Sequence, residues 1–246
     1  MLQGQIWVLR TRTRACGGTV RLAIFRYRKL IPMNQKASVV CGASTSGSSL
    51  FHIKFMVALT DRLLMSYDEY LAWEATQEIR HEYINGEAIA MAGSTRNHNR
   101  VTGNIFKILD NALGDRQCEV YIADVKVQVE PSCKYFYPDV VVTCAESDRD
   151  PQLVLFPCLI IEVLSPSTEA YDRGFKFSQY RKFDSLQEYV LAQIEQPVVE
   201  VFQRNQDGKW LFTEYCIGDR IFLKSVNVEM TVSDLYRQVQ FDQILS

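Results

Sequence analysis

The sequence predicts a mixed α/β (α+β) fold, in which helices flank a mixed β-sheet and an extra hairpin stands near each end of the domain. Three observations lead to this prediction. Apolar, β-branched stretches of strand length follow one another between residues 119 and 164. A segment with helical spacing lies on either side of these stretches. Two pairs of short stretches, one near each end of the domain, surround sequences typical of tight turns.

The first predicted elements are a short helix, a hairpin and a longer helix. Ser66-Tyr67-Asp68-Glu69 is a capping box, which predicts a short helix that runs through Trp73. Stretches 80–84 and 87–91 flank Asn85-Gly86, a strong hairpin sequence because both residues tolerate the left-handed backbone of a type I′ turn. Apolar residues at helical spacing then predict the longer helix: Val101, Ile105, Ile108 and Ala112.

The remaining elements follow from the same patterns. Apolar composition predicts strands at 119–129, 137–143, 158–164 and 188–194. Residues 172–183 are predicted as a second helix. The C-terminal hairpin pairs 198–203 with 210–216 around Asn205-Gln206-Asp207-Gly208, and a short strand and a helix near 232–239 complete the domain.

Residues 1–55 differ in composition from the rest of the chain. They contain nine Lys and Arg and no Asp or Glu, and a Ser/Gly/Thr cluster at 42–49 cannot bury enough apolar surface to order itself. Such a stretch is typical of a transit peptide. It is also expected if the start codon has been assigned too far upstream of Met56, and we favour this second explanation. We therefore expect a disordered extension or a misassigned start at 1–55, and one folded domain at 56–246.

The net charge of −2 conceals an uneven distribution: residues 56–246, which we call the acidic body, carry an excess of Asp and Glu. Once the nine basic residues of 1–55 are set aside, 18 basic and 29 acidic residues remain in 56–246, a net charge of −11. This charge opposes binding to nucleic acid, because attraction to phosphate normally dominates that binding.

The cysteines and the hydropathy indicate a cytoplasmic protein. None of the seven cysteines forms a C-x-x-C pair, which excludes the usual zinc-ligand spacing. No apolar run is long enough to cross a bilayer, and an odd number of cysteines in a chain of this length argues against a disulfide framework. We expect reduced thiols at Cys118, Cys133, Cys144, Cys158 and Cys216.

Two carboxylates inside apolar strands carry the chemical hypothesis. Asp139 lies in Tyr137–Val142 and Glu162 in Leu159–Leu164, where an unpaired carboxylate is costly to bury. If the two strands are adjacent, both carboxylates can hold one hard divalent cation such as Mg²⁺. Lys176 on the following helix adds a positive charge. This set of residues suits a metal-dependent phosphodiesterase, in which the metal activates water and the lysine stabilises the transition state.

Three further polar residues are candidates for the same site. Glu87 directly follows the hairpin turn and is a candidate third metal ligand, while His98 and Asp124 are candidate auxiliary residues. Each candidate also has a plainer structural interpretation. Glu87 could be exposed, His98 could serve the start of a helix, and Lys176 could be a solvated residue paired with Asp172 four positions earlier.

The motifs resemble those of a known family. Pro138-Asp139 followed about twenty residues later by Glu162 resembles the PD-(D/E)XK nuclease superfamily. Over roughly residues 60–240 the chain more closely resembles the Uma family of putative restriction endonucleases. The matching stretches are Asn85–Glu87, Tyr137–Val142, Glu162–Thr168, Asp172–Lys176 and Tyr180-Arg181.

The resemblance implies a restriction-endonuclease-like core and a DNA endonuclease that depends on Mg²⁺, with Mn²⁺ as a substitute. It implies Asp139, Glu162 and Lys176 as catalytic residues, and a homodimer, because cutting both strands of a duplex usually needs two active sites. One departure stands out: the superfamily places a lysine two residues after the glutamate, and this chain has Leu164 there. The resemblance suggests that Lys176 takes over from the helix.

Two other functions fit the same residues. With Leu164 in the lysine position and an acidic body, the chain could be a catalytically inactive nuclease fold that binds nucleic acid or a protein. It could also be a metal-dependent hydrolase of nucleotides, for which a negative surface is less of a handicap.

Overall fold

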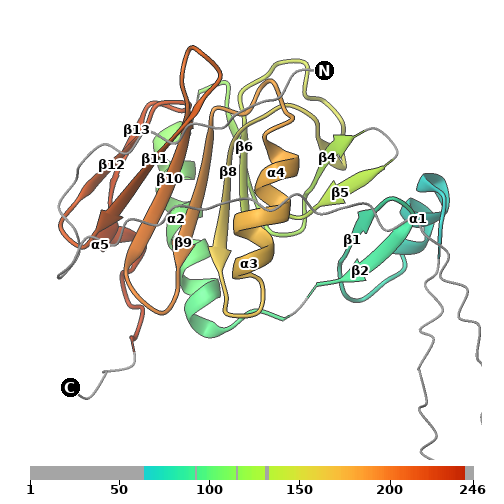
Figure 1. Ribbon diagram of the computed structural model, residues 1–246, viewed down its shortest axis with the longest axis horizontal. Coiled ribbons are helices and arrows are strands. Elements are labelled where there is room, and N and C mark those ends of the chain that lie inside the picture. Colours follow the sequence, from blue (N-terminus) through green and yellow to red (C-terminus); the bar gives the residue numbers. More distant parts are fainter. Residues whose placement is uncertain (1–63, 92, 115, 131–132, 242–246) are drawn as a thin grey trace, which may run out of the picture. The chain divides into compact units, whose positions relative to one another are not determined.

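The computed structural model describes residues 64–91, 93–114, 116–130 and 133–241 (Figure 1). The extension expected at 1–55 and the expected start of the domain lie outside these residues. The described part contains a six-stranded sheet, a five-stranded sheet and a two-stranded hairpin. The prediction of a mixed β-sheet flanked by helices is confirmed, but the two predicted hairpins are parts of the five-stranded and six-stranded sheets rather than extra elements. No helix within the described ranges has both the length and the apolar character needed to span a membrane.

The N-terminal helix and hairpin form where the sequence predicts them. Helix α1 (Tyr67–Glu74) begins with the capping box, in which the Ser66 hydroxyl accepts from the Glu69 N–H and the Glu69 carboxylate accepts from the Ser66 N–H. Strands β1 (His81–Ile84) and β2 (Glu87–Ala90) are antiparallel. Asn85 and Gly86 turn the chain between them with φ of 51° and 99°, as a type I′ turn requires.

Helix α2 (Arg96–Leu113) also forms, but its buried face differs slightly from the predicted one. The buried apolar residues are Val101, Ile105, Leu109 and Leu113, whereas Ala112 is exposed. The helix packs on the sheet along a row of residues four apart. Ile108 packs against the same core and is partly buried, so only Ala112 falls outside the buried face. Thr95 caps the helix by accepting from the His98 N–H at 3.2 Å.

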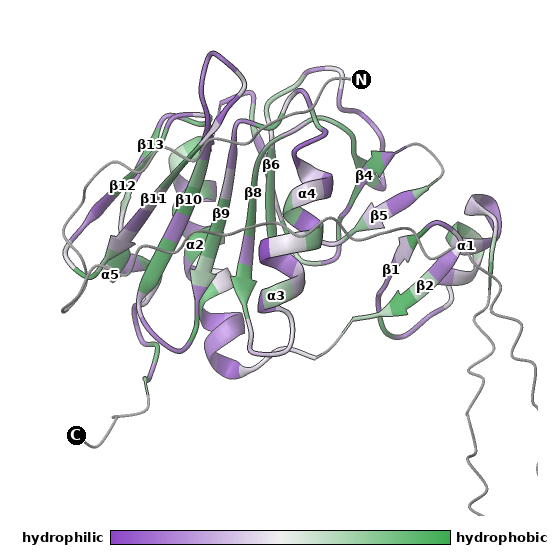
Figure 2. Cartoon of the chain, in the orientation of Figure 1, coloured by the Kyte–Doolittle hydropathy of each residue, from purple (hydrophilic) through white to green (hydrophobic). Residues whose placement is uncertain are grey.

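The six-stranded sheet has the order β11-β10-β9-β8-β6-β3. Its strands are β3 (Glu119–Ile122), β6 (Val140–Thr143), β8 (Pro157–Leu164), β9 (Glu188–Gln193), β10 (Val198–Arg204) and β11 (Trp210–Cys216). Strands β8 and β9 are parallel and all other neighbours are antiparallel, so the sheet is mixed. Hydrophobic residues run along β8, β9 and β10 (Figure 2), because both faces of the sheet are covered.

The predicted strand at 119–129 is wrong, because it is two strands in two sheets. Ala123 adopts a positive φ of 58° and turns the chain after β3. The chain then enters the five-stranded sheet, which has the order β2-β1-β5-β4-β7. Its other strands are β4 (Lys126–Glu130), β5 (Lys134–Phe136) and β7 (Leu153–Val154).

The second predicted helix is a compound segment over residues 169–180. It consists of α3 (Glu169–Tyr171), a π-helical turn η1 (Asp172–Lys176) and α4 (Phe177–Tyr180). The segment starts earlier than predicted and ends at Tyr180 rather than Phe183. It lies against the face of the six-stranded sheet that carries Ile160 and Leu164 (Figure 1).

The C-terminal region holds one more strand than predicted. Strands β12 (Arg220–Leu223) and β13 (Val228–Thr231) pair, and helix α5 (Val232–Leu235) is shorter than the predicted 232–239. The fully buried carboxylate of Glu188 anchors the turn between these strands. It accepts from the N–H groups of Lys224 and Ser225 and from the side chains of Ser225 and Gln203.

The expectation of reduced thiols is wrong for part of the set. Cys118 and Cys144 form a disulfide, and Cys216 is also disulfide-bonded. Cys133 and Cys158 are free thiols among the described residues. Counting cysteines and their spacing missed the bond, because Cys118 and Cys144 are 26 residues apart in sequence and become neighbours only when β3 pairs with β6.

We expect Glu188→Ala to lower the free energy of unfolding by about 3 kcal/mol or more, because it leaves buried N–H donors without an acceptor. Urea unfolding would measure this loss. The control is Glu229→Ala on β13, which removes an exposed ion pair with Arg220 and should change stability by less than about 1 kcal/mol. Equal effects of the two substitutions would refute the anchoring role.

Candidate active site

Asp139 and Glu162 lie on neighbouring strands, as the chemical hypothesis requires. Val140 of β6 pairs with Ile161 of β8 in antiparallel register, which places Asp139 opposite Glu162. The Asp139 N–H donates to Glu162 Oε2 at 3.4 Å, and the Val163 N–H donates to Asp139 Oδ2 at 2.7 Å. The backbone of each strand thus holds the carboxylate of the other.

Lys176 lies at the centre of three carboxylates. Its Nζ is 2.9 Å from Glu82 Oε1, 3.2 Å from Glu162 Oε1 and 3.5 Å from Asp172 Oδ1. The Lys176 side chain is 7% exposed, and the three acidic side chains are buried as well. Lys176 is therefore a buried ion-pair residue rather than a solvated one.

The local structure explains why these side chains converge. Alternation along β8 directs Glu162 to the same face as Ile160 and Leu164, toward the helical segment. In that segment Asp172 and Lys176 lie four residues apart within the π turn, and Tyr180 follows four residues later. Single π turns inside helices are frequent at functional sites. The hairpin contributes Glu82 from β1.

Tyrosine hydroxyls orient this acidic group, which we call the Lys176 cluster (Glu82, Glu162, Asp172 and Lys176). Tyr180 donates to Glu162 Oε1 at 2.9 Å, and Tyr171 donates to Glu82 Oε2 at 2.9 Å. Tyr189 donates to the backbone carbonyl of Asp172 at 3.0 Å. The bonds from Tyr180 and Tyr171 fix the rotamers of two carboxylates that would otherwise be costly to bury, and the bond from Tyr189 holds the backbone of the π turn.

The electrostatics of the cluster stabilise the charged form of Lys176 and disfavour the charged form of Glu162. Burial raises the pKa of Glu162 well above its usual range; Lys176 opposes this shift, and the other carboxylates add to it. Burial alone would lower the pKa of Lys176, but Glu162, Glu82 and Asp172 outweigh burial and raise it well above its usual range. Lys176 therefore keeps its proton at neutral pH.

The cluster has an excess of negative charge that a cation would offset. Three carboxylates surround one ammonium, so the four groups carry a charge of −2 when all are ionised. The buried Oε1 of Glu82 accepts no hydrogen bond, although the ammonium is close. Carboxylate oxygens are the ligands that Mg²⁺ prefers, so the donor chemistry fits this ion. No three His, Cys, Asp or Glu side chains in the described part of the chain are already arranged as ligands.

Asp139 and His98 form the more exposed side of the site. His98 Nε2 is 3.4 Å from Asp139 Oδ2, and the two side chains are 16% and 19% exposed. Burial lowers the pKa of His98, but the hydrogen bond and the charge of Asp139 together outweigh burial and raise it. The histidine that the sequence placed at a helix start therefore also contacts a predicted site residue.

The other two candidate residues occupy different positions in the fold. Glu87 pairs with Ile84 beside the turn, on the same face of the hairpin as Glu82 but two residues along from it. Asp124 is 70% exposed and forms an ion pair with Arg80. Sequence reasoning missed Glu82, Asp172 and Tyr180. Glu82 lies in a predicted strand, but its neighbours Arg80, His81 and Tyr83 do not form the apolar run that singled out Glu162.

Comparisons with known proteins identify a family and two similar relatives. Residues 67–236 match the family Uma2, described as "Putative restriction endonuclease". An uncharacterized protein of Synechocystis sp., slr1290, is 40% identical over 178 residues, which is 72% of this chain and 94% of that protein. A second one, sll1609, is 40% identical over 162 residues, 65% of this chain and 91% of its own length.

A solved structure has a similar fold. The crystal structure of a putative nuclease of the DUF820 family from Anabaena variabilis superposes with a TM-score of 0.58 at 17% identity. The match covers 70% of this chain and 97% of that one.

We expect Lys176→Met to lower the free energy of unfolding by about 3–5 kcal/mol, because it leaves three buried carboxylates without their cation. Urea unfolding in EDTA would measure the loss. Adding Glu162→Gln to this variant should restore part of the stability, because it removes one of the stranded charges.

The matched control is Lys182→Met, whose side chain is 44% exposed and pairs with Glu130. It should cost less than about 1 kcal/mol. A loss for Lys176→Met no larger than that of the control would show that the ion pairs do not hold the cluster together.

Proposed function

Because the chain belongs to the Uma2 family of putative restriction endonucleases, we propose that it is a Mg²⁺-dependent endonuclease that hydrolyses phosphodiester bonds in DNA. The observation that carries this proposal is the position of Lys176. Position 164, two residues after Glu162, holds an apolar leucine, and the Lys176 ammonium lies 3.2 Å from the Glu162 carboxylate. The helix thus supplies the positive charge that the strand lacks.

Asp139 and Glu162 would hold the metal, and Glu82 is better placed than Glu87 to be the third carboxylate. When bound, the ion would lower the pKa of a coordinated water and offset charge on the phosphate. Mn²⁺ has a similar preference for carboxylate ligands and would substitute. Tyr180 and the Val163 N–H would keep Glu162 and Asp139 in fixed orientations, which is how positioning lowers a barrier.

Lys176 would act through its charge rather than as a base. A general base needs a pKa near the working pH, whereas three carboxylates raise the pKa of Lys176 well above its usual range. Its ammonium would stabilise the negative charge that builds up on the phosphate oxygens. His98 would orient Asp139 and lies on the exposed side, where substrate can approach.

Substrate and assembly follow from the same proposal. DNA is the substrate that the family description favours, and cleavage of both strands would use two copies of the site in a homodimer. The acidic body opposes such binding, because attraction between basic residues and phosphate normally dominates it.

We expect the purified full chain to nick supercoiled plasmid in Mg²⁺ or Mn²⁺ and to lose this activity in EDTA. Asp139→Asn, Glu162→Gln and Lys176→Met should each reduce the rate by at least about 100-fold, as removal of one transition-state-stabilising group commonly does. Gel analysis of nicked and linear DNA would measure the rates, and circular dichroism would confirm that each variant is folded.

Asp124→Asn is the control, because Asp124 is exposed and away from the cluster; it should leave the rate unchanged. Cleavage that survives all three site variants would point to a contaminant. A folded wild type that binds DNA or a protein without cleaving any nucleic acid would instead favour the binding-module alternative.

A second comparison separates the two hairpin glutamates. Glu82→Gln should reduce nicking by at least about 10-fold, because it removes a carboxylate that contacts Lys176. Glu87→Gln, on the same hairpin face, should change the rate less than about 2-fold. Initial nicking rates of the two variants at a fixed metal concentration would show which glutamate contributes to the site. The reverse order of effects would restore Glu87 as the third ligand.

A further inference from the structure

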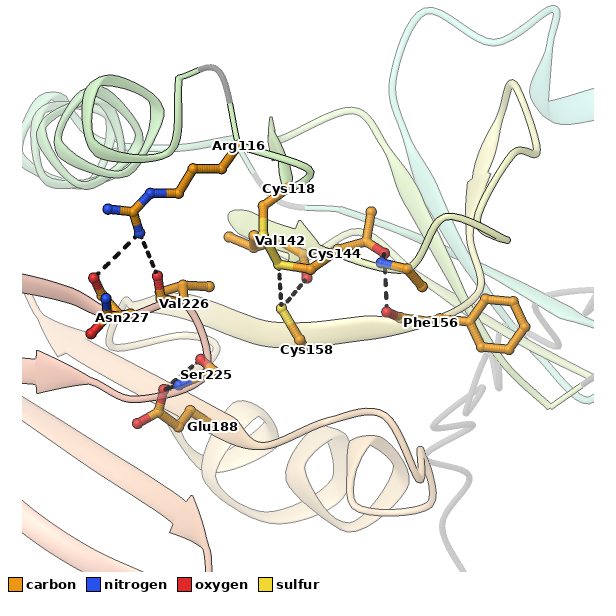
Figure 3. The surroundings of a disulfide bond; sticks show 12 residues. Arg116, Cys118, Val142, Cys144, Phe156, Cys158, Glu188, Ser225, Val226 and Asn227 are labelled. Carbon is orange, nitrogen blue, oxygen red and sulfur yellow. Dashed lines mark hydrogen bonds between the residues drawn. A yellow bond between two sulfur atoms is a disulfide. The ribbon is translucent and has the colours of Figure 1, made fainter.

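Three sulfur atoms gather at the end of β6 that is far from Asp139 (Figure 3). Cys118 and Cys144 form a disulfide, which joins the chain just before β3 to the chain just after β6. The free thiol of Cys158, on β8, lies 3.6 Å from Cys144 Sγ and donates to the carbonyl of Val142 at 3.4 Å.

A β-bulge brings Cys158 to this side of the sheet. Val142 pairs with Leu159, but the next residue of β6, Thr143, pairs with Pro157. Cys158 is thus the extra residue of the bulge. Regular alternation would place its side chain with Ile160 on the opposite face, whereas it packs on the same apolar cluster as Leu159, Cys118 and Cys144. Bulges commonly re-aim a side chain in this way.

We propose that Cys144 is the shared partner of two alternative disulfides, so that Cys118, Cys144 and Cys158 form a thiol–disulfide exchange site. The exchange would move the covalent link of β6 from β3, at the edge of the sheet, to β8. Strands β6 and β8 are the pair whose other ends carry Asp139 and Glu162.

The exchange is balanced without an external oxidant. Cys158 loses its proton and its thiolate attacks Cys144 Sγ, which forms the Cys144–Cys158 bond and breaks the Cys118–Cys144 bond. Cys118 leaves as a thiolate and takes up a proton. Uncatalysed rearrangements of this kind take minutes to hours. Burial raises the pKa of Cys158 to about 11, so little thiolate is present at neutral pH. We therefore expect this exchange to take hours rather than minutes.

The surroundings keep Cys118 accessible and in place. Cys118 lines an open hollow of about 320 Å³ together with Asp110 and Tyr121, so small thiols can reach it. Two residues earlier, Arg116 donates to the carbonyls of Val226 at 3.2 Å and Asn227 at 3.5 Å (Figure 3). These bonds would hold the segment that carries Cys118 close to Cys144 while the Cys118 sulfur is a free thiol. The exchange can then run in reverse.

Disulfide mapping of the full chain tests the proposal. Cleavage after Lys and Arg separates the relevant cysteines into peptides 117–126 (Cys118), 127–134 (Cys133), 135–149 (Cys144) and 150–173 (Cys158). Wild type and Cys118→Ser would be incubated for hours with a mixture of reduced and oxidised glutathione, blocked with an alkylating agent at low pH, digested and analysed by mass spectrometry.

In Cys118→Ser we expect peptide 135–149 to be linked mainly to 150–173. In wild type we expect the link between 117–126 and 135–149 to dominate, with a minor link between 135–149 and 150–173 that disappears in Cys158→Ser. Cys133→Ser is the matched control, because its thiol lies outside the cluster, and it should give the wild-type pattern.

The proposal fails if folded Cys118→Ser has Cys144 and Cys158 both alkylated, or has Cys144 linked to Cys133 as often as to Cys158. Cys118→Ala serves as a second variant if the serine form does not fold. If neither variant folds, the disulfide map of the wild type decides the question. Absence of the link between 135–149 and 150–173 after incubation would then overturn the proposal.

Discussion

The ion pairs of one buried lysine hold together the parts of the molecule that form its candidate active site. Lys176 contacts Glu82 of the five-stranded sheet, Glu162 of the six-stranded sheet and Asp172 of the helical segment. Each of these carboxylates alone would be expensive to bury, and together they would repel one another. The ammonium makes their burial tolerable, so the hairpin, the central strand and the π turn meet at one point.

The surrounding groups limit how this charge cluster can act. Tyrosine hydroxyls donate to Glu162 Oε1 and Glu82 Oε2, and the Asp139 N–H donates to Glu162 Oε2, so these carboxylates cannot turn freely toward solvent. Asp139 and His98 differ, since both keep some exposure. The site thus has a buried half that is held by hydrogen bonds and ion pairs and a half that keeps some exposure.

The sequence was sufficient for the parts of this structure that depend on local pattern. The capping box at Ser66, the turn at Asn85-Gly86 and the carboxylates within β-branched runs each act over a few residues, and each was found. What was missed depends on long-range pairing. Nothing near Glu82 indicates that β1 will face Lys176, and the positive φ of Ala123, which divides one predicted strand between two sheets, occurs without a glycine. The Cys118–Cys144 bond likewise arises only from the pairing of β3 with β6.

The π turn at Asp172–Lys176 makes the helical segment sensitive to its exact length. A π turn is equivalent to one residue added to an α-helix, and each residue of an α-helix advances the chain by about 100°. Loss of a single residue within this turn would therefore leave Asp172 in place but rotate Tyr180 away from Glu162. Relatives that keep this tyrosine–glutamate contact should tolerate substitutions along the segment far more readily than insertions or deletions in it.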